Sequence, residues 1–157
     1  MQRNIRIATP NYRGMRFIDA DSVDEVTKKQ KNFGPRCDSL FQKLNIKMYG
    51  ANAVALTPTQ LNAKRLELKK MARAIKESVI DEDYPDQDKS WSDVSPMDQH
   101  YYMLLLEEKA AKVSMNIFHC KNMWCARNVF QEIIKGNKQT VNRRNKRVSE
   151  IYKYTVY

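Results

Sequence analysis

The longest regular pattern of hydrophobic positions in this chain runs from Ser95 to Gly136. Ser95 is suited to cap a helix that has Pro96 at its first position, and Gly136 is suited to the left-handed residue that follows a helix end. The spacing predicts a central helix over 96–135, either continuous or as a pair of helices with a break near residues 120–122. Its main apolar face consists of Met97, Tyr101, Leu104, Leu105, Ala111, Met115, Phe118, Cys125, Val129 and Ile133.

A second group of apolar residues in the same stretch falls outside that face. A helix that is apolar on more than one side is either central in its bundle or buried against a partner. We therefore expect a protein partner or self-association through the central helix. The residues of this second group are Tyr102, Met103, Leu106, Ile117, Met123, Trp124, Phe130 and Ile134.

Two amphipathic helices are predicted before the central one. The first follows Gly34-Pro35 and is stopped by Gly50. The second is expected over 58–80, because Thr57 can cap it, a proline follows at the first helical position, and Gln60 completes the capping box. The apolar face of the first helix consists of Cys37, Leu40, Phe41, Leu44 and Met48.

The sequence also predicts the structure of four further segments. Residues 1–20 carry unopposed arginines and predict a basic, extended arm. A capping box predicts a short polar helix over 22–32. Residues 81–90 form an acidic linker that a proline interrupts, and a basic helix is expected over 139–152.

These elements predict an all-α fold: an irregular bundle of about five helices around the central helix or helix pair. Residues 21–157 are expected to form a single helical domain, preceded by the basic arm over 1–20. A chain of 157 residues is long enough to bury a core. Its 4 glycines and 5 prolines are too few for a sandwich or barrel with many turns, and no apolar run approaches the length of a membrane span.

Charge narrows the class of partner. The formal net charge of +10 points to a polyanion, most often nucleic acid. The cysteines number 3, an odd count that argues against a disulfide framework and predicts an intracellular protein with reduced thiols. In a eukaryote we expect the nucleus or a ribonucleoprotein particle.

The candidate phosphate contacts are basic residues at helical spacing. One group lies on the helix expected over 58–80 and the other on the helix expected over 139–152. Lysine and arginine on phosphate release counterions, which gives salt-dependent affinity without sequence preference. The candidate nucleic-acid-binding residues are Arg65, Lys69, Arg73, Lys76, Arg143, Arg144, Lys146 and Arg147.

Residues that could carry catalysis or hold a metal do not form a recognisable motif. Cys120 and Cys125 are five apart on an expected helix, which is not the spacing of a structural zinc site. The acidic linker lacks the glycine and glutamate of a calcium-binding loop. Asp86, Glu107 and Lys109 echo a nuclease pattern, but two of them lie on a helix rather than on strands. We expect no enzyme activity, no metal and no cofactor.

One short stretch resembles a known family. Trp91 to Pro96, followed by Tyr101, is similar to the start of the last helix of HMG-box proteins, which bind and bend DNA. The resemblance covers about a dozen positions, and an acidic linker precedes it where that family has a helix. No residue matches the wedge that the family inserts between bases, so its properties are not carried over to this chain.

The sequence therefore predicts a non-catalytic basic helical protein. Its function would be to bind nucleic acid through the phosphate backbone, within a chromatin or ribonucleoprotein assembly. The alternative is a structural or interaction subunit of a protein assembly, whose basic faces meet acidic protein surfaces.

Overall fold

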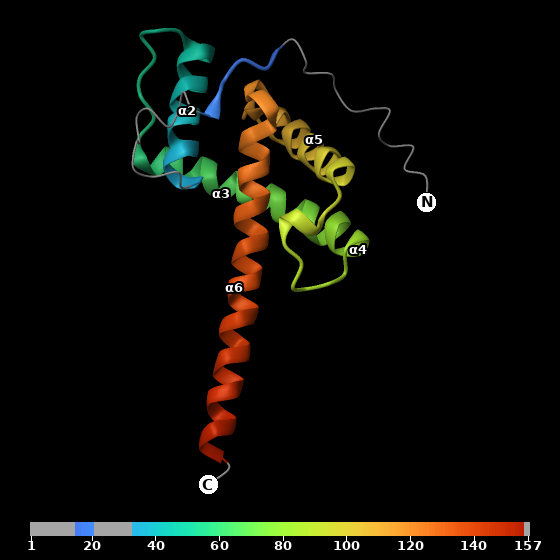
Figure 1. Ribbon diagram of the computed structural model, residues 1–157. Coiled ribbons are helices and arrows are strands. Elements are labelled where there is room, and N and C mark those ends of the chain that lie inside the picture. The colour runs from blue at the N-terminus through green and yellow to red at the C-terminus, as the bar shows by residue number, and fades with distance from the viewer. Residues whose placement is uncertain (1–14, 21–32, 156–157) are drawn as a thin grey trace.

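The structure is a computed structural model that describes residues 15–20 and 33–155 (Figure 1). Side chains in the last helix are described up to residue 134 and again at 143, 144 and 146–151. The fold is all-α, as predicted, and the described residues contain no strand beyond a single bridge between Ile18 and Cys120. The elements are α2 (Phe33–Tyr49), α3 (Pro58–Ile75), the π-turn η4 (Lys76–Ile80), α4 (Asp81–Asp83), α5 (Pro96–Lys112), α6 (Trp124–Thr155) and the short 3₁₀ turns η5 (Trp91–Asp93), η6 (Ile117–His119) and η7 (Lys121–Met123).

The helix boundaries follow from local capping chemistry. The Thr57 hydroxyl accepts from the Gln60 N–H, and the Gln60 side chain accepts from the Thr57 N–H, which confirms the capping box of α3. The Ser95 side chain accepts from the Asp98 N–H at the start of α5. Gly50 ends α2 with φ at 89°, a left-handed conformation that glycine adopts without steric cost.

The predicted central helix is two helices, α5 and α6, separated by residues 113–123. The prediction that Gly136 ends a helix is wrong, because α6 continues through it to Thr155. The helix predicted over 139–152 is thus the C-terminal half of α6. A glycine inside a helix costs about 1 kcal/mol relative to alanine, which the hydrogen bonds of a long helix can absorb.

The end of α5 is a Schellman motif built on a residue other than glycine. The Ser114 N–H donates to the Ala111 carbonyl at 3.1 Å, and the Met115 N–H donates to the Ala110 carbonyl at 2.9 Å. This geometry requires Ser114 to adopt a positive φ of 62°. The chain direction is therefore reversed by a serine, whose Cβ disfavours this conformation.

Replacing Ser114 with glycine is expected to raise the free energy of unfolding by about 0.5–1 kcal/mol, because glycine adopts a positive φ without strain. Urea denaturation of the two proteins measures this difference. A lower free energy of unfolding in Ser114→Gly would show that the serine side chain contributes more than its backbone strain costs.

The second apolar group of the central region is buried inside this same chain. All eight residues, from Tyr102 to Ile134, lie in the hydrophobic core. Trp91 of η5 stacks on Phe130 of α6 with ring centroids 5.1 Å apart. Among the residues of the main face, Met97 is instead 66% exposed. The apolar surplus is explained by packing of α5 and α6 in their own bundle, so it no longer requires a partner.

The N-terminal segment is packed where it is described. Ile18 forms its bridge with Cys120, and the Trp124 indole N–H donates to the Ile18 carbonyl at 3.0 Å. Residues 15–20 therefore lie against the connection between α5 and α6 rather than forming a free arm. Residues 1–14, and the helix predicted over 22–32, lie outside the described part of the chain.

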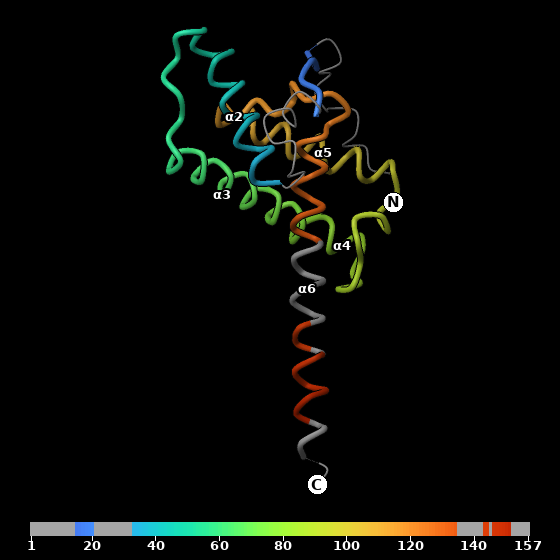
Figure 2. The backbone as a smooth tube through the Cα atoms, turned by 60° about the vertical axis from the view of Figure 1, so that its left-hand side comes forward, coloured from blue at the N-terminus to red at the C-terminus, as the bar shows by residue number. Residues whose placement is uncertain are grey.

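Helix α6 has two parts with different surroundings. Its first turns pack against α2, α3 and α5, and the rest of the helix projects from the body of the protein (Figure 1). Figure 2 shows the same projection from another direction. At 1.5 Å per residue, the part from residue 135 to 155 is about 30 Å long. Within the described residues, no helix has the length and apolar character needed to cross a membrane.

Candidate nucleic-acid interface

Two of the predicted phosphate contacts on α3 lie beside a recess between α2, α3 and α6. Arg65 pairs with Asp38 of α2, with Nε and Oδ1 3.1 Å apart. The Lys69 ammonium lies 5.0 Å from the centroid of the Phe33 ring. Glu132 of α6 lines the same recess. The charge on this part of α3 is therefore partly compensated by carboxylates of neighbouring helices.

Lys76 is placed in the interior rather than on the basic face of α3. Its side chain is 8% exposed, and its Nζ lies 3.0 Å from Asp81 Oδ2. Lys89 donates to Asp81 Oδ1 at 2.7 Å. Burial tends to raise the pKa of Asp81, but hydrogen bonds from Lys89 and Lys76, together with their charges, outweigh it and lower that pKa. Lys76 therefore belongs to a partly buried ionic cluster with Asp81 and Lys89.

Lys76 itself keeps α-helical geometry, because its N–H donates to the Ala72 carbonyl, and the π-turn that follows positions its partner Asp81. The Asp81 N–H donates to the Lys76 carbonyl, five residues earlier, so one extra residue is accommodated in this turn. An extra residue rotates the following side chains by about 100° relative to an uninterrupted α-helix. The exposed basic stripe of α3 ends at Arg73, because Lys76 is buried beside Asp81.

The projecting half of α6 carries the remaining four predicted contacts, and all four are exposed. At about 100° per residue, they spread over nearly half of the helix circumference. Glu150 lies one turn beyond Lys146 and Arg147 and is the sole acidic residue from 135 to 157. The four residues, hereafter the α6 cations, are Arg143, Arg144, Lys146 and Arg147.

The basic residues that the structure describes lie on different parts of the fold. The α6 cations lie on the part of the helix that has left the body, beyond its crossing with α3 (Figures 1 and 2). Arg16, from the predicted arm, is turned inward and binds Glu107 through two hydrogen bonds of 2.7 Å. The structure therefore leaves the α6 cations as a separate, outlying basic group.

Burial of Glu107 was not foreseen from the sequence. Its side chain is 0% exposed, and Arg16 also donates to the carbonyls of Phe118 and Cys120 at 3.1 Å. Burial raises the pKa of Glu107, and the hydrogen bonds and charge of Arg16 offset part of that rise. A glutamate on a helix is normally expected to face solvent. The sequence did not reveal that Arg16, distant along the chain, is the partner that Glu107 has in the interior.

The other candidate chemistry does not assemble into a site in the described residues. Cys37, Cys120 and Cys125 are free and buried, and contact with the first two raises the pKa of the Cys125 thiol. No cluster of potential ligands suitable for a metal ion occurs in the described part of the chain. Asp86 and Lys109 are exposed on separate elements, whereas Glu107 is occupied by Arg16.

Comparisons with protein-family models, with curated proteins and with solved structures find no match to this chain.

Proposed function

We propose that this protein binds nucleic acid through the phosphate backbone, with the projecting half of α6 as its main contact. The observation that carries the proposal is an exposed group of four cations on a helix that stands clear of the rest of the protein. A helix of about 10–12 Å diameter fits the major groove of duplex DNA, and its basic side chains then reach phosphates on both sides.

Electrostatics within the helix supports the same partner. Arg143 lies three and four residues before Lys146 and Arg147, a spacing at which like charges on a helix repel. The side chains described in this half, at 143, 144 and 146–151, are all exposed, so their packing does little to offset this repulsion. Isolated helices of this length are marginal in water. A polyanion would neutralise the charges and stabilise the helix, so binding and helix stability are coupled. In a cell, such a protein would act within a chromatin or ribonucleoprotein assembly.

The test is a titration of the full chain into labelled duplex and labelled single strand at two salt concentrations. If about four phosphates are neutralised, raising the salt from roughly 50 to 200 mM should weaken duplex binding by roughly 10²-fold. Affinity that is absent at the lower salt, or that does not change between the two, would contradict the proposal.

One observation favours the alternative, an interaction subunit that meets an acidic protein surface. Val148 and Ile151 are 51% and 63% exposed on the projecting half of α6. An apolar pair on a basic helix is suited to pack against an acidic amphipathic helix. Under this alternative, Val148→Ser/Ile151→Ser would weaken a protein complex, whereas under nucleic-acid binding this variant would keep duplex affinity within about twofold.

A further inference from the structure

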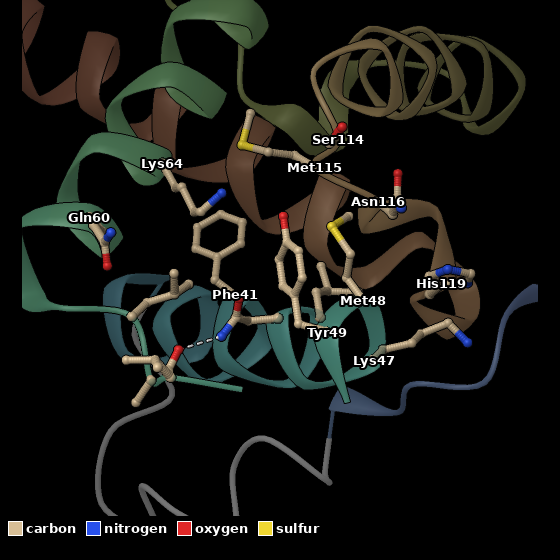
Figure 3. A pocket seen from close by; sticks show the side chains of 15 residues that line it. Phe41, Lys47, Met48, Tyr49, Gln60, Lys64, Ser114, Met115, Asn116 and His119 are labelled. Carbon is tan, nitrogen blue, oxygen red and sulfur yellow. Dashed lines mark hydrogen bonds between the residues drawn. The ribbon is translucent and has the colours of Figure 1, made fainter. Parts of the chain in front are cut away.

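A cavity in the body of the protein lies far from the projecting helix. Its volume is about 540 Å³, and it is bounded by the end of α2, the loop before α3, the start of α3 and the segment after α5 (Figure 3). This volume lies within the range typical of small-ligand sites, about 300–1,000 Å³. Its apolar walls include Phe41, Leu44, Met48, Leu56 and Met115.

Hydrogen bonds to α2 hold the loop that forms one wall of the cavity. The Gln42 amide donates to the Leu56 carbonyl and accepts from the Leu56 N–H, both at 2.9 Å. The Asn45 amide donates to the Val54 carbonyl at 2.9 Å. These bonds tie the loop before α3 to α2, so the cavity is formed before any ligand arrives. A preformed site loses less free energy to ordering when it binds.

The charge on the cavity lining is of one sign. Lys47 and Lys64 line it, and its lining includes no carboxylate. The Lys47 ammonium already lies 4.2 Å from the Phe17 ring centroid, whereas Lys64 and the Tyr49 hydroxyl extend into the open space of the cavity (Figure 3). Burial lowers the pKa of His119 at the far edge, so its imidazole adds no positive charge at neutral pH.

Apolar surface around the opening is left in contact with water. Tyr49 is 71% exposed and Val54 is 90% exposed, and both line the cavity. A ligand with an apolar body would cover these side chains as well as the inner walls, and its burial would be favourable in proportion to the area removed from water.

We propose that this cavity binds a small organic anion with an apolar body. The body would lie against Phe41, Met48 and Met115, and its carboxylate, sulfonate or phosphate would accept hydrogen bonds from the Lys64 ammonium and the Tyr49 hydroxyl. The aromatic and thioether side chains suit a planar or flexible hydrocarbon, and the absence of acids in the lining favours a negative head group over a neutral or cationic one. This site is independent of the nucleic-acid contact on α6.

Two probes with the same aromatic body test the proposal on the full chain. 1-Anilinonaphthalene-8-sulfonate carries an anionic group, and N-phenyl-1-naphthylamine lacks it. Fluorescence titration should show that the anionic probe binds the wild-type protein more tightly. Lys64→Gln should weaken binding of the anionic probe by about tenfold and leave the neutral probe within about twofold, because a charge-assisted hydrogen bond is lost.

Two further variants separate the cavity from general surface binding. Lys70→Gln removes an equal charge from the exposed face of α3 outside the cavity lining, and should change neither affinity. Ala55→Trp fills the cavity from its exposed loop and should abolish binding of both probes while the far-ultraviolet circular dichroism stays native. Binding that survives Ala55→Trp, or that falls equally in Lys64→Gln and Lys70→Gln, would overturn the proposal.

Discussion

Replacing Arg16 with methionine is expected to lower the free energy of unfolding by about 3–5 kcal/mol, because it leaves a buried carboxylate without its partner. Glu107 is fully buried, and the two hydrogen bonds from Arg16 are the contacts that compensate its desolvation. Urea denaturation of Arg16→Met and of the wild-type protein at neutral pH measures the loss.

An exposed ion pair from the same region provides the matched control. Lys121 and Asp19 lie 3.2 Å apart, with side chains 47% and 57% exposed. Solvent screens such a pair, so Lys121→Met should cost less than about 1 kcal/mol. The double variant Arg16→Met/Glu107→Leu should recover most of the loss in Arg16→Met, because it removes the unpaired charge as well. Equal losses in Arg16→Met and Lys121→Met would contradict burial of the Glu107 pair.

The loss in Arg16→Met should also depend on pH with a defined sign. Burial raises the pKa of Glu107, and removal of Arg16 takes away the interactions that lower it. The folded variant then holds the Glu107 proton more tightly than the unfolded chain does. The free energy of unfolding of the variant therefore falls as the pH rises through the raised pKa of Glu107. The difference in the free energy of unfolding between wild type and Arg16→Met should be smaller near about pH 5 than near about pH 8.

Replacing all four α6 cations with glutamine is expected to weaken binding to a duplex by at least about 10²-fold at roughly 0.1 M salt. The slope of log affinity against log salt should become shallower by about three to four, because four phosphate contacts and their released counterions are lost. Fluorescence anisotropy with a labelled duplex measures both quantities. The variant should keep its core, since the four side chains are exposed.

A second quadruple variant separates local contact from net charge. Its replacements lie on exposed lysines of the body and remove the same formal charge as the first variant. If the contact is local, this control should lose less than about tenfold in affinity and keep nearly the wild-type salt slope. Equal losses in the two variants would show that binding follows net charge alone. The control replaces Lys70, Lys109, Lys112 and Lys121 with glutamine.

Local features of the fold were predictable because their causes are local. The Thr57 and Ser95 caps, and the stop at Gly50, each depend on a few neighbouring residues. A break near residues 120–122 was one of the two predicted alternatives, and those residues lie in the connection between α5 and α6. The earlier end of α5 was not predicted, because Ser114 carries no sequence sign of a left-handed conformation. Gly136 gave the opposite error, since glycine permits a helix end without requiring one.

The candidate site was predictable only in part, because it depends on contacts between distant residues. Helical spacing predicted that the candidate cations lie on helices and face solvent, and the α6 cations are indeed exposed. Helical spacing also assigned Lys76 to the surface, and the run of unopposed arginines assigned Arg16 to an extended arm. Their carboxylate partners, Asp81 and Glu107, become apparent once the π-turn and the packing of residues 15–20 are known.

Amide hydrogen exchange of the full chain, with and without a duplex, tests most directly whether the projecting half of α6 is the contact. We predict that peptides covering residues 143–151 exchange rapidly in the free protein and become strongly protected on the duplex, while peptides of α3 change little. Protection confined to α3 or to the N-terminal residues, with no change over 143–151, would contradict the account.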